Sequence, residues 1–298
     1  IIFLGTGTSG SLPSNLCINS HPGSPCTVCL SCLDPCSEQG FRNRRRNSSI
    51  IVRYQDPHSP NSRLLNVLID CGKSYYEAAK DWMVEHNVPC IDALILTHGH
   101  ADAMMGLDDL REWTAMRTSL RPTASIPVYL TRETMRVVQR AFPYIADPRK
   151  ATGGGAVAAL QFIVIDGNEV FAILDGKIRI MPLPVEHGPV PVKVPFISHG
   201  FRFGNVVYIS DASGLCPETP ARLHNADIHI LDILRDYPHA SHWSVEQAIE
   251  VAKHFKPRLM LSVGMGHELD TLEFNQALAQ TQPERGFPAM AAHDGMRL

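Results

Sequence analysis

Two histidines and an aspartate stand directly after a short apolar stretch of this sequence. Residues 93–96 predict a buried strand, and His98, His100 and Asp102 follow it at intervals of two residues. Because side chains alternate in an extended segment, the two imidazoles would point the same way and could bind one metal ion. With 14 histidines in 298 residues an isolated pair is a weak sign. A pair at the end of a strand, followed by a carboxylate, predicts a metal site.

Two further apolar runs end at a potential metal ligand. One run precedes His187, and another, Val206 to Ser210, precedes Asp211. Each of these residues alone is common at strand ends and turns. Three apolar strands that end in His or Asp favour a shared site instead. The predicted ligands of a catalytic metal ion are His98, His100, His187 and Asp211.

Four cysteines lie close together in an irregular insertion, rich in Cys, Pro and Arg, over about residues 17–47. Cys26, Cys29 and Cys32 are each separated by two residues, and Cys36 follows four residues later. In a reducing compartment, thiols at this spacing favour a structural zinc site over disulfides. The alternative is a redox-labile loop without a metal ion.

The composition is that of an ordinary globular protein, with 44% hydrophobic residues, 19% charged residues and a formal net charge of −3. A large nucleic-acid-binding surface would make the balance strongly basic, so nucleic acid is not an expected partner. No apolar run approaches the ~20 residues that span a bilayer, so no membrane contact is expected. Eight scattered cysteines favour a reducing, cytoplasmic location. The absence of an initiator Met leaves a targeting peptide open.

Strands alternate with helices along the chain. Helices are predicted near 73–86 and 103–116, and the clearest one begins at Ser244, where Gln247 completes a capping box. Each half of the chain combines strands with helices. We therefore expect one α/β domain over residues 1–298, a four-layer αββα sandwich of two mixed β-sheets flanked by helices.

These motifs resemble the metallo-β-lactamase superfamily, whose pattern is H-x-H-x-D-H followed by a later His, an Asp and a final His. Within it, the chain looks most like the phosphodiesterase branch that includes tRNase Z and the phosphoribosyl cyclic phosphate phosphodiesterases. The resemblance covers nearly the whole length. Besides the histidine motif it rests on Phe3-Leu4-Gly5-Thr6-Gly7, Arg44-Arg45-Arg46-Asn47, Ile69-Asp70-Cys71-Gly72, Gly106-Leu107-Asp108-Asp109-Leu110-Arg111, Tyr208-Ile209-Ser210-Asp211 and Met265-Gly266-His267.

The chain departs from the superfamily pattern at two histidines that bind a second metal ion in dinuclear relatives. Ala103 stands in place of the first and Gly264 in place of the second. The resemblance then implies one catalytic divalent ion, zinc or manganese, with only a weak second site at Asp102 and Asp211. A rival alignment makes His267 the final active-site ligand.

The resemblance also implies how the structural zinc site is completed. The similar phosphodiesterase uses a histidine that matches His267. The inferred structural zinc ligands are Cys26, Cys29, Cys32 and His267. Cys36 is the substitute if Cys32 faces away, and Cys17 falls outside the spacing.

The expected substrate is a small phosphorylated molecule. In the resembling phosphodiesterase a histidine that aligns with His242 assists catalysis, and His239, close to it in the sequence, is expected to bind substrate. The alternative is that both histidines only form part of a turn. Arg44 and Arg45 belong to the one tight basic run and could bind phosphate.

Three functions are compatible with these residues. The leading hypothesis is a metal-dependent phosphodiesterase that hydrolyses a small or cyclic phosphate ester with a metal-bound hydroxide. Asp102 would orient the hydroxide and His242 would protonate the departing oxygen. The alternatives are a thioester or lactam hydrolase on the same fold, and a metal-binding protein with reduced catalysis. A homodimer is compatible with each.

Overall fold

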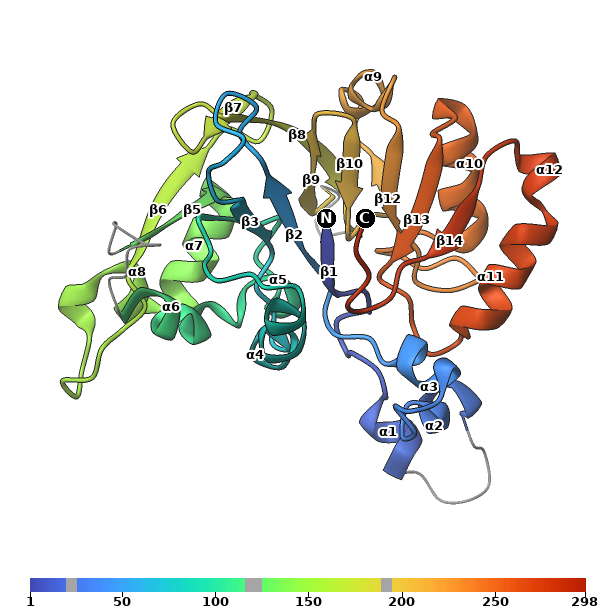
Figure 1. Cartoon of the computed structure of the whole chain (residues 1–298), viewed down its shortest axis with the longest axis horizontal. Coiled ribbons are helices and arrows are strands. Elements are labelled where there is room, and N and C mark those ends of the chain that lie inside the picture. The colour runs from blue at the N-terminus through green and yellow to red at the C-terminus, as the bar shows by residue number, and fades with distance from the viewer. Residues whose placement is uncertain (20–25, 116–124, 189–194) are drawn as a thin grey trace. The chain divides into compact units, whose positions relative to one another are not determined.

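The computed structural model of the chain describes residues 1–19, 26–115, 125–188 and 195–298 (Figure 1). The chain divides into two compact units. Unit 1 comprises Ile1–Leu4, Ser49–Arg179 and Gly295–Leu298, and unit 2 comprises Gly5–Ser48 and Ile180–Asp294. Each unit therefore combines segments that are far apart in the sequence. A single domain over all 298 residues stays a prediction.

Unit 1 is built on a mixed sheet. Its strands follow the order β1 (Ile2–Gly5), β2 (Ser49–Tyr54), β3 (Leu65–Ile69), β4 (Ala93–Ile95), β5 (Ile126–Thr131) and β6 (Leu160–Ile165). Strands β2 and β3 are antiparallel, whereas the pairs β3–β4, β4–β5 and β5–β6 are parallel. A short strand, β7 (Phe171–Ile173), follows β6 in the chain. Parallel strands bring their carboxyl ends to one edge of the sheet, where His98 follows β4.

Short helices connect the strands of unit 1. They are α4 (Tyr75–Ala78), the π-helix η1 (Ala79–Met83), α5 (Ala101–Met104), the 3-10 helix η2 (Leu107–Leu110), α6 (Arg111–Ala115), α7 (Arg132–Ala141), α8 (Pro143–Ala146) and the 3-10 helix η3 (Pro148–Lys150). The helix predicted over about 103–116 is therefore wrong as one element, because the chain turns at Gly106, whose N–H donates to the carbonyl of Cys71 at 2.8 Å. That bond ties the segment after the histidines to the end of β3.

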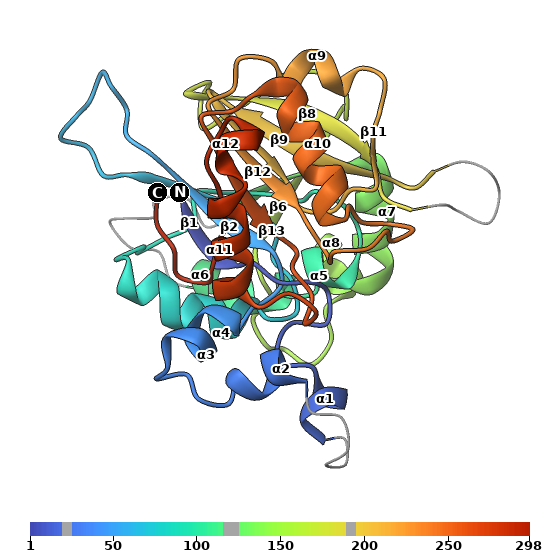
Figure 2. The same cartoon turned by 90° about the vertical axis from the view of Figure 1, so that its right-hand side faces the viewer.

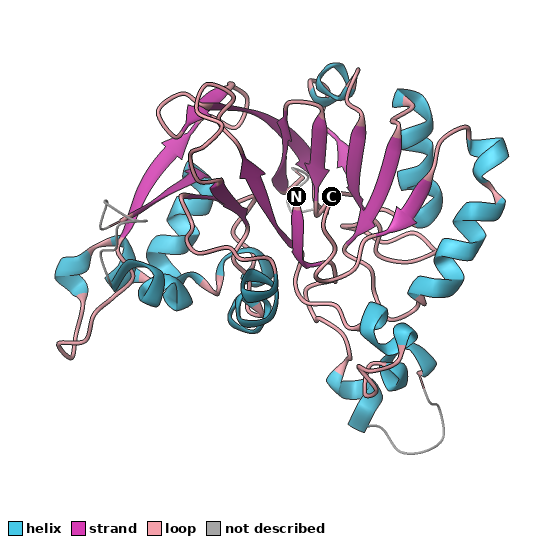
Figure 3. Cartoon of the chain, in the orientation of Figure 1, coloured by secondary structure: helices cyan, strands magenta, loops and turns pink. Residues whose placement is uncertain are grey.

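Unit 2 contains the second mixed sheet, drawn in magenta with the first in Figure 3. Its order is β11 (Gly214–Leu215), β8 (Ile178–Glu186), β9 (Ile197–Phe203), β10 (Val206–Ile209), β12 (Ile228–Asp232), β13 (Leu259–Val263) and β14 (Ala289–Ala291). The pairs β8–β9 and β9–β10 are antiparallel, and β10, β12, β13 and β14 form parallel pairs. The carboxyl ends of β10 and β12 therefore meet at one edge.

Helices of unit 2 share an apolar core with the strands of the second sheet. They are α1 (Asn15–Asn19), α2 (Thr27–Ser31), α3 (Glu38–Asn43), α9 (Thr219–Leu223), α10 (Val245–Phe255), α11 (Thr271–Gln280) and α12 (Gln282–Arg285). Figure 2 shows α10 and α11 in front of the strands of this sheet. Ala248 and Ala252 of α10 are buried in the same apolar cluster as Leu231 of β12 and Phe274 of α11.

The predicted start of α10 is confirmed. The Ser244 hydroxyl accepts the N–H of Gln247 at 3.4 Å, and the Gln247 side-chain oxygen accepts the N–H of Ser244 at 2.9 Å. This reciprocal capping satisfies backbone donors that have no partner inside the helix. Both sheets are mixed and flanked by helices, which confirms the predicted α/β class. No helix among the described residues is long and apolar enough to cross a membrane.

The buried histidine of β12 should make stability depend on pH. His229 is fully buried, and burial lowers its pKa to about 4. The unfolded chain binds this proton near the ordinary pKa of about 6.5, so stability should be lost as the pH falls from about 6.5 to about 4. The total contribution is about 3 kcal/mol. Urea unfolding measures this effect. Between about pH 7 and about pH 4.5, the free energy of unfolding should fall less in His229→Leu than in the wild type.

The exposed His254 of α10 provides the control. In His254→Leu, the free energy of unfolding should differ between the two pH values by as much as it does in the wild type. If the free energy of unfolding fell equally in the wild type and in His229→Leu, His229 would not contribute to the pH dependence of stability.

Candidate metal-binding and catalytic sites

The two histidines after β4 lie side by side in unit 1. The rings of His98 and His100 have their centroids 4.6 Å apart at an interplanar angle of 82°. His98 is buried and His100 is exposed. Glycine separates them because a Cβ at Gly99 would lie 2.9 Å from the side chain of Val137 in α7. The packing of α7 thus fixes the backbone that carries both imidazoles.

A hydrogen-bonded chain behind His98 selects the nitrogen that it can present to a metal ion. His98 Nδ1 lies 2.8 Å from Thr97 Oγ1, which in turn lies 2.8 Å from Asp70 Oδ2. The Thr97 N–H also donates to Asp70 Oδ1 at 2.8 Å. Metal-binding imidazoles commonly use their second nitrogen in such a contact. His98 is therefore held with Nε2 as the nitrogen suited to a metal ion, and Asp70 is a supporting residue that the sequence analysis did not identify.

Asp102 and Ala103 occupy the first turn of α5. Asp102 is half-buried there, and the Ala103 side chain is 2% exposed. The carbonyl of Ala103 accepts the N–H of Cys71 at 2.7 Å. The Ala103 side chain is thus a buried methyl group, which cannot bind a metal ion.

Three potential ligands meet in unit 2. His187 follows β8, Asp211 follows β10 and His242 precedes α10, and one ligand atom from each lies within 4.8 Å of the others. His187 Nδ1 lies 2.7 Å from the carbonyl oxygen of Ser241, to which it donates a hydrogen bond. Its Nε2 is then the nitrogen suited to a metal ion. Two imidazoles and one carboxylate are a donor set that suits zinc and neighbouring transition metals.

His242 also contacts a buried carboxylate at the end of β12. His242 Nδ1 lies 2.9 Å from Asp232 Oδ2 and 3.8 Å from Asp211 Oδ1. The Asp232 side chain is fully buried, and burial raises the pKa of its carboxyl, an effect that the nearby His242 opposes. The sequence analysis did not identify Asp232. The signal that found Asp211, an apolar strand ending in a carboxylate, could have found it.

Gly264 directly follows β13 and faces the same carboxylate. Its φ is +79°, and a Cβ at this position would lie 2.3 Å from Asp232 Oδ1. Both the backbone and the neighbour exclude a side chain here. A side chain at this position would therefore strain the backbone and displace the Asp232 carboxylate.

His239 belongs to the same part of unit 2. Its ring centroid is 5.4 Å from that of His242, and its Nδ1 accepts the N–H of Ser241 at 3.3 Å. Burial lowers the pKa of His239, and the neighbouring His242 and Arg235 lower it further. A neutral imidazole at this place could hydrogen-bond to a substrate oxygen.

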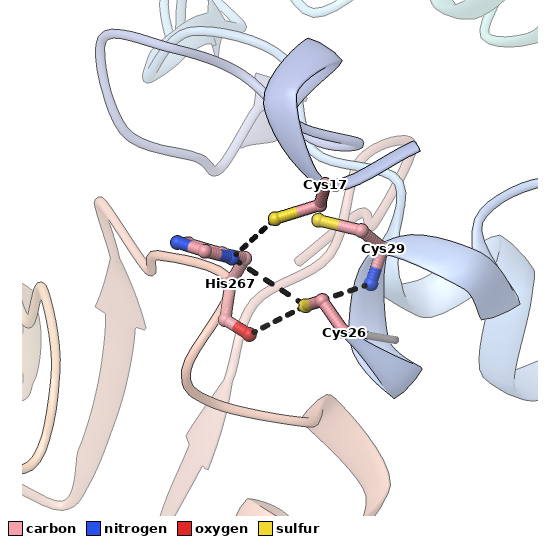
Figure 4. A group of neighbouring side chains, drawn as sticks. All are labelled: Cys17, Cys26, Cys29 and His267. Atoms are coloured by element: carbon pink, nitrogen blue, oxygen red, sulfur yellow. Dashed lines mark hydrogen bonds between the residues drawn. The ribbon is translucent and has the colours of Figure 1, made fainter. Parts of the chain in front are cut away.

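Three of the four residues predicted to bind the structural zinc ion come together, and Cys17 joins them in place of Cys32. Cys17 of α1, Cys26, Cys29 and His267 converge in unit 2 (Figure 4). The Sγ atoms of Cys17 and Cys26 lie 3.2 Å and 3.4 Å from His267 Nδ1. Tetrahedral zinc would hold a sulfur and a nitrogen about 3.5 Å apart, so the spacing fits zinc. The N–H of Ser14 also donates to Cys29 Sγ at 3.3 Å, as a thiolate ligand requires.

Cys32 is not part of this group, so the predicted ligand set needs a correction. Cys26 and Cys32 are the N-cap and C-cap residues of α2, and six steps of about 100° place them about 120° apart around the helix. Cys32 is instead buried in a small apolar cluster, and its Sγ donates to the carbonyl of Val28 at 3.2 Å. The substitute Cys36 is exposed and outside the group as well. Cys17, which the spacing of the cysteines excluded from the predicted site, takes the place of Cys32 in the group.

Arg45 was predicted to bind substrate, and the structure contradicts this. Its side chain is 1% exposed. The guanidinium donates to the carbonyls of Gly266 and Leu269, both at 2.7 Å, and to Thr271 Oγ1 at 2.7 Å. Arg45 therefore stabilises the turn that carries His267. Arg44 is exposed at the end of α3, and its contact with substrate stays a prediction.

Comparisons with known proteins show the family and the fold of the chain. The family model described as the beta-lactamase superfamily domain matches residues 65–265. The crystal structure of a diphosphatase from the PhnP family is 28% identical, with a TM-score of 0.76 over 100% of this chain and 96% of that chain. The short form of human tRNase Z is 16% identical, with a TM-score of 0.61 over 99% of this chain and 96% of that one, and so shares the fold.

One curated relative carries a different activity in its name. An octanoyltransferase of Porphyromonas gingivalis (strain ATCC BAA-308 / W83) is 26% identical over 250 residues. The match includes 84% of this chain but only 42% of that protein. This chain thus spans less than half of the relative's length.

Proposed function

Because the chain belongs to the beta-lactamase superfamily and is a metal-dependent hydrolase, we propose that it is a phosphodiesterase for a small or cyclic phosphate ester. The cluster of His187, Asp211 and His242 in unit 2 carries this proposal, because it joins potential metal ligands to a potential proton donor. The whole-length similarity to a diphosphatase favours phosphorus as the atom attacked.

The proposed ligands of the catalytic metal ion are those that the sequence motifs predict, His98, His100, His187 and Asp211. His98 and His187 both use Nδ1 in a contact with an oxygen, which leaves Nε2 as the natural ligand atom. A divalent ion there would polarise the phosphoryl group and lower the pKa of the attacking water. Three imidazoles favour zinc, and manganese remains the alternative.

The other proposed roles belong to the chain's own side chains. Asp102 orients the attacking water and takes its proton as the water oxygen bonds to phosphorus. The bond between phosphorus and the leaving oxygen then breaks, and His242 enters the step as the imidazolium, gives that oxygen the proton of Nε2 and keeps the proton of Nδ1, which faces Asp232. His239 hydrogen-bonds to a phosphoryl oxygen.

A substrate comparison tests the proposal. Metal-depleted protein should not hydrolyse bis-(p-nitrophenyl) phosphate or a ribose cyclic phosphate, and added zinc or manganese should restore turnover. A diphosphate ester run in parallel determines whether the substrate class extends to diphosphates. Full metal loading without turnover of any phosphate ester would contradict the proposal and favour a metal-binding protein with reduced catalysis.

The octanoyltransferase similarity favours a second candidate, a thioester hydrolase. The same arrangement could direct water at the carbonyl carbon of an acyl thioester. An octanoyl thioester and a β-lactam belong in the same assay for this reason. Faster metal-dependent hydrolysis of the thioester than of any phosphate ester would make this candidate the function.

A further inference from the structure

The loop between β12 and α10 carries the two histidines proposed to act on substrate, and main-chain hydrogen bonds close it at its base. The N–H of Leu234 donates to the carbonyl of Trp243 at 3.0 Å, and the N–H of Val245 donates to the carbonyl of Arg235 at 3.0 Å. These bonds place the backbone of Arg235 beside the residues that directly follow His242. Arg235 is therefore anchored next to the proposed catalytic residues of unit 2.

The guanidinium of Arg235 is held by contacts within its own loop. Its Cζ lies 3.8 Å from the centroid of the Tyr237 ring. Its Nη1 donates to the Tyr237 hydroxyl at 3.1 Å, and its Nη2 donates to the carbonyl of Pro238 at 3.2 Å. Its Nε is buried without a hydrogen-bond partner among the described residues, so a ligand can reach only the two Nη atoms. Each Nη atom carries two N–H groups, and these contacts use one of each.

The positive charge of Arg235 has no negative partner within the part of the chain that the structure describes. Its hydrogen-bond partners there are a hydroxyl and a carbonyl oxygen, both uncharged, and no carboxylate forms an ion pair with it. Burial lowers the pKa of His239, and the charges of His242 and Arg235 lower it further, so the guanidinium is close enough to act on that imidazole. A guanidinium stays charged in proteins and matches the oxygens of phosphate. The loop therefore offers a place for an anion beside His239.

We propose that Arg235 forms an anion subsite, which binds the second phosphate of a diphosphate ester while His239 contacts the phosphate that is attacked. The inference deepens the proposed function and rests on it for the identity of the reaction. A guanidinium can hold phosphate oxygens through two N–H groups at once. A diphosphate ester has a second phosphate joined to the first through one oxygen, whereas a cyclic phosphate ester has only the phosphate that is attacked. Arg235 thus selects diphosphate esters as the substrate class.

A comparison of two substrates tests the subsite in the metal-loaded protein. Arg235→Ala should raise KM for a nucleoside diphosphate sugar about 10- to 100-fold, as expected for the loss of hydrogen bonds from a charged group. KM for a ribose cyclic phosphate should change less than about threefold, and kcat should change little for either, because the contact is made in the ground state as well as in the transition state. Arg235→Lys, which keeps the charge without the planar fork, should recover part of the loss.

The matched control is Arg258→Ala, which removes the same charge from an exposed position directly before β13. It should leave KM for both substrates as it is in the wild type. Equal losses on the two substrates in Arg235→Ala would mean that Arg235 contacts the attacked phosphate, and this result would overturn the inference.

Binding to the subsite can also be measured without turnover. A nucleoside diphosphate analogue with a methylene bridge has no bridging oxygen to cleave, and calorimetry of the metal-loaded protein gives its Kd. That Kd should rise about 10- to 100-fold in Arg235→Ala, or in Arg235→Gln if the alanine variant fails to fold, and should stay unchanged in Arg258→Ala. No binding of the analogue to the wild type, or an equal Kd in the wild type and the Arg235 variants, would refute the subsite. A wild type that binds the analogue through Arg235 but hydrolyses no phosphate ester would refute only the proposed function.

Discussion

Replacing His98 or His187 by alanine should remove the catalytic metal ion and lower phosphodiesterase turnover about a thousandfold, because a metal ion supplies several kcal/mol of charge stabilisation. Each imidazole follows a strand whose core is intact without it, β4 in unit 1 and β8 in unit 2. Circular dichroism and thermal unfolding should therefore remain close to the wild type. Elemental analysis and turnover of bis-(p-nitrophenyl) phosphate measure the two losses.

The exposed His58 of unit 1 and His254 of unit 2 give matched controls. His58→Ala and His254→Ala should retain the full metal content and rate. The double variant of His98 and His187 should be no worse than either single one, since both remove one ion. A His187→Ala protein with unchanged metal occupancy and turnover would show that the proposed ligand set is wrong.

Cys17→Ser should release the structural zinc ion and lower the thermal unfolding temperature of the zinc-loaded protein by many degrees. The reason is that a structural zinc ion contributes folding free energy on the order of 10 kcal/mol, and residues 26–32 offer only a small apolar cluster to replace it. Zinc per chain, thermal unfolding and limited proteolysis of the insertion measure the effect. The histidine-site metal should stay bound.

Cys32→Ser and Cys36→Ser are the controls that distinguish the observed ligand set from the one expected from spacing. Cys36→Ser should change nothing, because its side chain is exposed. Cys32→Ser should keep the zinc ion and lose only a little stability through a hydroxyl in an apolar cluster. Loss of zinc from Cys32→Ser with zinc retained in Cys17→Ser would reverse the assignment.

Local patterns in the sequence were sufficient to predict the strands and the helix that carry the candidate metal ligands and catalytic residues. Apolar runs predicted β4, β8 and β10, and a His or Asp shortly after each run was predicted to be a metal ligand. Ser244 and Gln247 determined the start of α10, since capping depends on residues three apart. The family was recognisable from these short motifs, and the family model confirms it.

Tertiary structure decided which side chains meet when they are distant in sequence. Cys17 lies 250 residues before His267, so no local spacing could show that it replaces Cys32. Arg45 was predicted to bind phosphate because its burial could not be foreseen. The turn that buries it lies more than 200 residues away in the sequence. The pairing of Asp232 with His242 and the closed space at Gly264 likewise require two strands and a loop to be packed together. Sequence determines residue types and local geometry, whereas contacts between distant segments form only when the core brings their backbones together.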